Sequence, residues 1–343
     1  MSRRTWTLVV SVAFAMVLGV LGGVATVPYV ALGPGPTFDA LGRVDGTTVV
    51  KIEGERTYPT TGQLNMTTVS VVDGVTLFGA LGFWLSGRNA LVPRDEIFPP
   101  EQTADEIQQR NAALFEDSET SAEAAALRYL GYPSPVVETV ADDGATRSSL
   151  QPGDELVRID GSAVGSTQEA LDALSGRTSG ERVDVTYRRG SFPEEVITVT
   201  LGPGPDPGRG YLGITITDHP EVDFEITISL ADVGGPSAGL IFAMAVVDKL
   251  TPGPLTGGRF VAGTGQITST GEVRPIGGIP FKMLKAKEVG AAVFLVPAEN
   301  CVEAAGNAPE GLRLIKVGSL DDAVRGLTAL QAGVEPVGCG STP

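Results

Sequence analysis

The chain has 343 residues, of which 42% are hydrophobic, and its formal net charge at pH 7 is −16. This length predicts two or three domains with packed cores. The acidic balance argues against a nucleic-acid partner, which would need a basic surface. With one histidine and two well-separated cysteines there is no credible zinc site, and no acidic calcium loop occurs, so we expect neither a metal nor a cofactor.

The N-terminal segment 5–32 contains no charged side chain and is rich in Leu, Val and Ala. A transmembrane helix needs about 20 apolar residues. Arg3 and Arg4 precede the segment and no basic residue follows before Arg43, so the positive-inside rule predicts a single-pass plasma-membrane anchor with the bulk of the chain outside the cytoplasm. A cleaved signal peptide is the alternative, although its apolar region is typically shorter and no clean A-x-A site occurs.

The region that follows, 33–124, is expected to be a mixed N-terminal part of the ectodomain. Its Gly-Pro-Gly-Pro sequence at 33–36 is interpreted as the break after an anchor domain of residues 1–32. We find no catalytic constellation here, and we interpret the acidic charge as a solvated helix face. The expected elements are strands over 47–52 and 64–72, a short apolar helix over 76–85, and one or two acidic helices over 101–129.

Residues 125–202 resemble a PDZ domain. The sequence L-Q-P-G-D-E-L-V-R-I-D-G at 150–161 fits the signature L-x-P-G-D-x-[IL]-x-x-[IV]-[DN]-G of bacterial PDZ domains. Such domains bind peptide ends by adding a strand to an open sheet edge. Two segments loosely resemble the carboxylate-binding loop, so its location stays open: our candidate Leu130-Gly131-Tyr132, and Leu212-Gly213-Ile214. The remaining expected elements are a helix over 167–174, strands over 183–187 and 196–201, and a linker over 203–209.

Ser237 lies in the sequence Gly-Pro-Ser-Ala-Gly, directly before an apolar run over 238–250 that reads as a buried helix. A serine hydroxyl becomes a nucleophile only when a base takes its proton, and otherwise a serine here is a common helix cap. The α/β-hydrolase motif G-x-S-x-G needs a histidine downstream, but His219 precedes the serine. A triad of His219, Asp232 and Ser237 would crowd into a short segment.

A lysine is the base that remains. Lys282 follows the serine by 45 positions and has apolar neighbours such as Ile279, Phe281 and Met283. Desolvation in such surroundings disfavours the ammonium form and lowers the lysine pKa. The turn before the serine, Gly234-Gly235-Pro236, places it at a helix N-terminus, where backbone N–H groups can help to hold an oxyanion.

These two segments resemble the proteolytic domain of the Lon family. The shared residues are G-P-S-A-G at 235–239, T-G-Q-I-T at 264–268, G-E-V at 271–273, and P-I-G-G at 275–278 with Lys282 four residues on. The resemblance implies that Ser237 is the nucleophile, that Lys282 is the base, and that Thr264 orients the pair. It also implies a proteolytic domain over 210–335 and a possible homo-oligomer, a hexameric ring. No Walker A sequence occurs, so the ATPase of Lon is not expected.

The whole arrangement is similar to bacterial membrane-anchored Lon-like proteases with a PDZ domain. The fold class is α+β multidomain: a transmembrane helix, a mixed ectodomain region, a PDZ domain and a Lon-type α/β proteolytic domain. The predicted function is an ATP-independent serine endopeptidase acting on exported or membrane-associated proteins; the alternative is a non-catalytic PDZ peptide-binding adaptor on a Lon-like fold. Because an oxidising exterior permits disulfides, we predict a bridge from Cys301 to Cys339 that ties the tail, 336–343, to the proteolytic domain.

Overall fold

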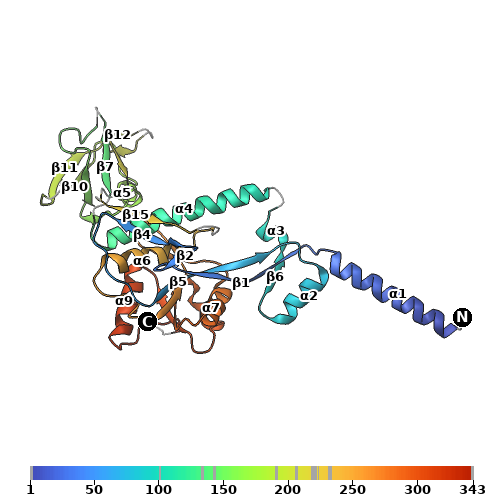
Figure 1. Ribbon diagram of the computed structural model, residues 1–343. Helices are drawn as coiled ribbons and strands as arrows, with labels where there is room; N and C mark the ends of the chain where they lie inside the picture. The colour runs from blue at the N-terminus through green and yellow to red at the C-terminus, as the bar shows by residue number, and fades with distance from the viewer. Residues whose placement is uncertain are drawn as a thin grey trace.

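The chain forms a projecting N-terminal helix, a large mixed domain, and a smaller domain of strands at the upper left of Figure 1. Long helix α4 lies along the large domain and leads toward the smaller one. The computed structural model describes residues 3–99, 102–132, 135–141, 144–189, 192–204, 208–217, 222, 224–230 and 234–340.

The N-terminal helix α1 spans Arg3–Val24 and is long and apolar enough to cross a membrane. Its 22 residues correspond to about 33 Å at 1.5 Å per residue, close to the thickness of a bilayer core. A signal sequence near the N-terminus can have the same length and apolar composition. The helix is shorter than the predicted anchor, because the chain turns into a strand at Tyr29.

The large domain is built on a six-stranded sheet in the order β20-β19-β16-β5-β1-β6. Strands β5, β16, β19 and β20 run parallel, and β1 is antiparallel to both of its neighbours. The strand bounds are β1 Tyr29–Asp39, β5 Gln63–Val72, β6 Ala90–Pro93, β16 Phe260–Gly263, β19 Val293–Pro297 and β20 Arg313–Val317. The region 33–124, which we expected to be separate from the proteolytic domain, thus supplies two inner strands of its sheet.

The Gly-Pro-Gly-Pro segment lies inside β1 and is not a break in the structure. Pro34 is paired with Val69 of β5, and the register then shifts before Thr37, as at a β-bulge. Proline lacks a backbone N–H and is tolerated in a sheet chiefly at edges and bulges, which explains why the composition of a loop is found within a strand.

Helices cover both faces of this sheet. One face carries α4 (Ala104–Tyr129), α6 (Gly239–Leu250) and α9 (Leu320–Gln331), and the other carries α7 (Ile279–Glu288) and α8 (Cys301–Gly306). Side chains alternate along β19, so Leu295 packs in the first core and Phe294 in the second. Phe115 of α4 meets Phe242 of α6 edge to face, with 5.8 Å between ring centroids. The acidic segment is therefore a core helix as well as a solvated one.

The smaller domain contains the sheet β11-β10-β8-β7-β14 and helix α5 over Thr167–Leu174, the range predicted for a helix. Its core includes Leu150, Leu156 and Ile159. The strand bounds are β7 Val136–Val140, β8 Asp154–Ile159, β9 Ser162–Ala163, which pairs with β8, β10 Arg182–Arg189, β11 Glu195–Thr200 and β14 Ile214–Thr217. Because β14 belongs to this sheet, the smaller domain extends beyond the predicted linker, 203–209, and into the segment that we had assigned to the proteolytic domain.

Short elements complete the fold. Strand β4 pairs with β15, and the remaining two-stranded ladders close turns. These elements are β2 Arg43–Val44, β3 Thr47–Thr48, β4 Val50–Glu53, α2 Leu77–Ser86, α3 Arg94–Ile97, β12 Gly202–Pro203, β13 Gly210–Tyr211, β15 Glu225–Ile228, β17 Gln266–Ile267, β18 Val273–Arg274 and the 3-10 turn Ala298–Asn300.

Candidate active site

The structure brings together three of the residues singled out in the sequence: Ser237, Thr264 and Lys282. The Lys282 Nζ lies 2.8 Å from the Ser237 Oγ and 2.9 Å from the Thr264 Oγ1. The Thr264 hydroxyl in turn lies 3.1 Å from the Ser237 carbonyl oxygen. This is the arrangement in which an uncharged amine can take a proton from a serine hydroxyl.

Lys282 occupies a position on the buried face of α7. The inward positions of this helix are Ile279, Lys282, Met283 and Ala286, so the lysine takes a place in an otherwise apolar stripe. Its side chain is nearly inaccessible, and Thr264 is fully buried. Burial without a compensating negative charge disfavours the ammonium form and lowers the pKa of Lys282 to about 7.

Ser237 is held in a tight turn immediately before α6. Gly235 has φ +89, a conformation that side chains disfavour, and its N–H donates to the Asn111 carbonyl of α4 at 3.0 Å. The Ser118 hydroxyl of α4 donates to the Pro236 carbonyl at 3.2 Å. On the other side of the turn, the Gly265 N–H donates to the Ser237 carbonyl at 3.0 Å. Both sides of the turn are thus braced, one by α4 and the other by the segment after β16.

Two of the three turn residues predicted to assist an oxyanion have no free backbone N–H to offer. The N–H of Gly235 is already paired with Asn111, and proline has none. Within the described residues, the backbone N–H groups of Ser237 and Ala238 donate to no carbonyl. These two lie at the nucleophile itself, whereas Gly234, Gly235 and Pro236 shape the turn.

A cleft of about 430 Å³ opens beside the serine and the lysine. It is also lined by Thr68 and Val69 of β5, from the region in which sequence reasoning found no catalytic constellation. Val69 lies so close to Gly278 that a Cβ added to this glycine would be 2.6 Å from the Val69 Cγ2. No local pattern marks these two residues, because their role depends on strand pairing with β16.

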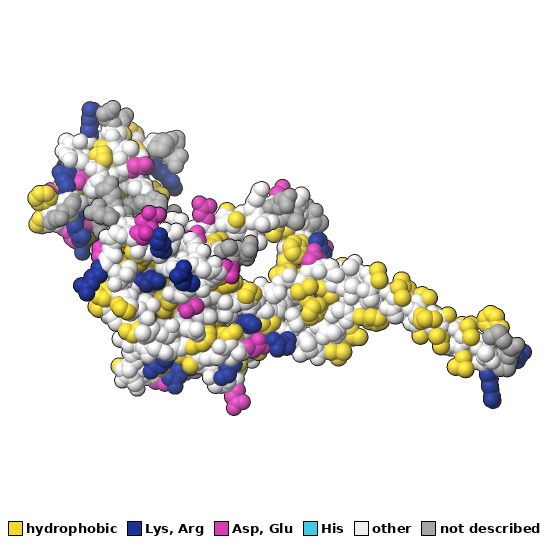
Figure 2. Space-filling model, in the orientation of Figure 1, with side chains coloured by type: hydrophobic (Ala, Val, Ile, Leu, Met, Phe, Trp, Pro, Cys, Tyr) yellow, Lys and Arg dark blue, Asp and Glu magenta, His cyan; other side chains and the backbone are white. Residues whose placement is uncertain are grey.

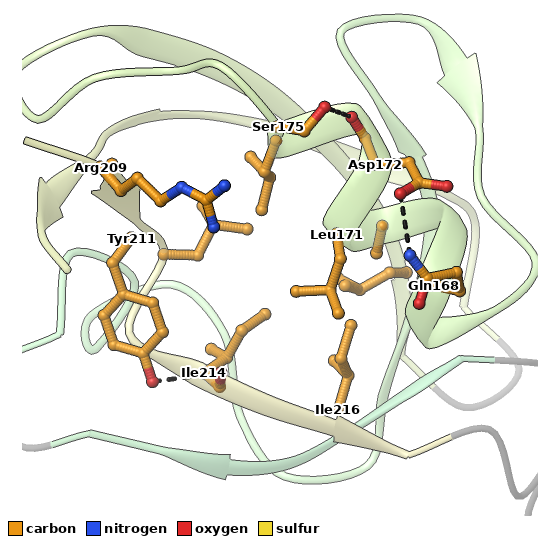
Figure 3. A pocket seen from close by; sticks show the side chains of 13 residues that line it. Gln168, Leu171, Asp172, Ser175, Arg209, Tyr211, Ile214 and Ile216 are labelled. Atoms are coloured by element: carbon orange, nitrogen blue, oxygen red, sulfur yellow. Dashed lines mark hydrogen bonds between the residues drawn. The ribbon is translucent and has the colours of Figure 1, made fainter. Parts of the chain in front are cut away.

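A second cavity, of about 370 Å³, lies in the smaller domain between α5 and β14. Figure 3 shows Leu171 of α5 facing Ile214 and Ile216 of β14 across it, with Tyr211 and Arg209 at one end. Strand β14 ends the sheet, so its far edge faces this groove. The groove is therefore apolar and bordered by a strand edge, the geometry that PDZ domains use for peptide ends.

The candidate loop Leu130-Gly131-Tyr132 does not line this groove; Leu212 and Ile214 of the alternative segment do. Leu130 caps α4 and packs against the core of the large domain, and Tyr132 contacts Phe224 edge to face at 5.3 Å. The motif at 130–132 is the end of a helix, where Gly131 takes φ +80. The selection of residues 130–132 as peptide-binding is corrected accordingly.

Two other predicted sites have different outcomes. Cys301 and Cys339 form a disulfide in the structure, with 4.9 Å between their Cα atoms. It joins α8 to the tail, whose Val337 carbonyl accepts a hydrogen bond from the Lys316 N–H of β20. His219 and Asp232, the members of the rejected triad, lie outside the described residues.

Comparison with protein families identifies the two domains. Residues 218–328 match the Lon protease (S16) C-terminal proteolytic domain, and residues 108–200 match the PDZ domain. The predictions of a Lon-type proteolytic domain and a PDZ domain, and of the multidomain α+β fold class, are confirmed.

Individual curated relatives agree with the first of these matches. A Lon protease of Heliobacterium modesticaldum is 37% identical over 131 residues, which is 37% of this chain and 15% of that protein. A Lon protease of Chloroflexus aggregans is 39% identical over 94 residues, covering 26% of this chain and 11% of that protein. Among solved structures, the PDZ domain of the SdrC-like protein of Listeria monocytogenes is 31% identical, covers 25% of this chain and 90% of that domain, and has a TM-score of 0.24. The chain thus matches only a small part of the full length of the curated Lon proteases.

Proposed function

We propose that the protein is an ATP-independent serine endopeptidase, held at the membrane by α1, in which Ser237 is the nucleophile and Lys282 the general base. The observation that carries the proposal is the 2.8 Å approach of a buried lysine amine, whose pKa is lowered to about 7, to the serine hydroxyl. A base works best when its pKa lies near the operating pH. An ordinary lysine, with a pKa of about 10.4, would be protonated there.

The reaction follows from this geometry. The Ser237 Oγ attacks the carbonyl carbon of the scissile peptide while its proton passes to the Lys282 Nζ. The tetrahedral oxyanion is stabilised by the N–H groups of Ser237 and Ala238 at the start of α6. Lys282 then gives the proton to the leaving amine, and the acyl-enzyme is hydrolysed by a water that the same lysine activates.

The PDZ groove supplies substrate selection. A peptide end that pairs with the edge of β14 would place apolar side chains against Leu171 and Ile216. The substrates are exported or membrane-associated proteins, because α1 places the cleft outside the membrane when Arg3 and Arg4 stay in the cytoplasm. No nucleotide enters the cycle, since the sequence has no Walker A motif.

The test of the function compares wild type with Ser237→Ala using a fluorophosphonate probe and a peptide library. We expect wild type to be labelled on Ser237 and to cleave peptides without ATP, and we expect Ser237→Ala to do neither. A wild type that binds peptides but resists the probe would support the adaptor alternative. Added protease on wall-stripped cells tests the topology separately, since a soluble, N-terminally trimmed product would indicate a signal peptide instead of an anchor.

A further inference from the structure

Helix α2 exposes a large apolar surface. Its sequence, L-F-G-A-L-G-F-W-L-S, has no charged side chain. Five large side chains are between 49% and 70% exposed: Leu77, Phe78, Leu81, Trp84 and Leu85. A helix on the surface of a soluble domain normally has a polar outer face, and a contiguous apolar patch marks an interaction site.

The exposure does not arise from a loosely attached helix. The inner face of α2 packs through Ala80 against Ala31 of β1 and Val75, which form a small core of their own. The Thr76 hydroxyl caps the first turn by accepting the Gly79 N–H at 3.1 Å. The outer face is therefore presented to its surroundings by a well-packed support.

The patch is continuous with the surface of α1. Gly22, the one buried residue of α1, lies under the ring of Phe78, and a Cβ at this glycine would be 2.5 Å from the Phe78 Cζ. The Leu77 N–H donates to the Ala25 carbonyl at 3.0 Å. Figure 2 shows hydrophobic side chains running along α1 and onto the part of the molecule where α2 lies. The end of the predicted membrane span and α2 thus form one surface.

Charged side chains begin only beyond this surface. Arg88, two residues after α2, pairs with Glu288 at 2.6 Å, and Arg94 pairs with Asp73 at 2.8 Å. Trp84 lies in the last turn of α2, four residues before Arg88 in the sequence. Tryptophan between an apolar and a polar layer is typical of a membrane–water interface.

We infer that α2 lies in the outer interface of the membrane that α1 spans, with Phe78, Leu81 and Trp84 inserted among the lipids. The inference rests on the proposed anchoring by α1. The ectodomain would then be attached at two points, so it could not rotate freely about α1. Val72 of β5 pairs with Ala31, which packs in the small core under α2. Val69 in the cleft lies three residues from Val72, about 10 Å along the strand at 3.3 Å per residue, so the cleft would lie close to the bilayer.

The chain contains two tryptophans, which allow a direct test. The full-length Trp6→Phe variant keeps Trp84 as its only tryptophan, and Trp84→Phe keeps Trp6 in α1. Each is reconstituted in vesicles of phosphatidylcholine and phosphatidylglycerol, with or without acyl chains brominated near the ester end. We expect bromine to quench both tryptophans and to leave the emission of Trp84 blue-shifted relative to an exposed indole.

The two variants separate the possible failures. Quenching of Trp6 without quenching of Trp84 would overturn the insertion of α2 and leave the anchor intact. Quenching of neither would overturn the anchor, and the inference with it. If Trp84 were unquenched by bromine but also shielded from acrylamide, a second copy of the chain would cover α2 instead of lipid. The double variant Leu81→Asn, Leu85→Asn, which alters exposed positions only, should reduce the quenching of Trp84 and leave that of Trp6 unchanged.

Discussion

The Thr264 hydroxyl lies 3.1 Å from the carbonyl oxygen of Ser237, and this contact fixes the direction of the hydrogen bonds in the site. A threonine hydroxyl has one proton, and here it is donated to that carbonyl. Toward the Lys282 Nζ, 2.9 Å away, Thr264 can therefore only accept. One N–H of the neutral amine is bound in this way, which leaves its lone pair free to face the serine proton.

Replacing Thr264 tests this role of a positioning residue. Thr264→Val keeps the shape but removes the acceptor. Lys282 becomes an ammonium as it takes the serine proton, and a hydrogen bond to a charged group is worth about 1.5–3 kcal/mol, or roughly 10- to 160-fold in kcat. Because the lost acceptor also stabilised the ammonium form, the midpoint of the pH–rate profile should move to lower pH. Thr264→Ser should retain most activity and the wild-type midpoint. A Thr264→Val enzyme with an unchanged midpoint would contradict the assignment.

Lys282 variants distinguish a base from a structural cation. Lys282→Met removes the amine and should lower kcat by on the order of 10²- to 10⁴-fold, the usual contribution of a general base. Lys282→Arg keeps the positive charge but should be equally inactive, because a guanidinium does not release its proton near neutral pH. Circular dichroism checks that each variant is folded. Wild-type turnover by a folded Lys282→Arg protein would show that lysine is not the base.

Activity should depend on pH through Lys282. The neutral amine is the active form, so kcat/KM should fall about tenfold for each pH unit below the pKa and level off above it. With a pKa of about 7, the rise should be centred near neutral pH. The rate of fluorophosphonate labelling of Ser237 should follow the same curve, which separates the chemistry from peptide binding. A flat profile between about pH 5 and pH 9 would be inconsistent with a lysine base.

The peptide groove can be tested without touching the catalytic residues. Leu171 on α5 is 55% exposed and lines the groove, so Leu171→Glu should weaken binding of peptide ends while the domain stays folded. The matched control is Val196→Glu, which changes a 63% exposed residue of β11 at the opposite edge of the same sheet. Fluorescence polarisation with labelled peptides measures both variants. Equal affinities for the two variants would place peptide binding elsewhere.

The Cys301–Cys339 bridge should stabilise the proteolytic domain. It closes a loop with a sequence separation of 38, for which loop-closure entropy predicts about 4 kcal/mol. Reduction should therefore lower the thermal midpoint and increase hydrogen exchange at Lys316, whose N–H bonds to the tail. The double variant Cys301→Ser, Cys339→Ser should be insensitive to reductant. Intact mass without reduction gives the direct check, since uptake of two alkyl groups would show free thiols.

The catalytic residues could be predicted from local sequence, but the pairing of distant strands could not. The segments around Ser237 and Lys282 could be predicted because the turn, the helix start and the apolar neighbours are encoded within a few residues. The placement of Thr68 and Val69 could not, since it depends on which distant strand pairs with β5. The same reason explains why the Leu-Gly segments at 130–131 and 212–213 could not be told apart from sequence. Only the fold shows that Leu212 lines the groove beside α5 and that Leu130 does not.

The pairing of β5 with β16 has a consequence for biogenesis. The Thr67 hydroxyl donates to the Gly263 carbonyl across 196 positions, and the whole PDZ domain lies between them. Contacts of such long range form late and slowly. In an ectodomain that crosses the membrane progressively from the end of α1 onward, β1, β5 and β6 could pair with one another first. Strand β5 would lack its parallel partner until β16 emerges, and Lys282 emerges later still. The active site would therefore assemble late in translocation, because the nucleophile and its base cannot meet until nearly the entire polypeptide has left the cytoplasm.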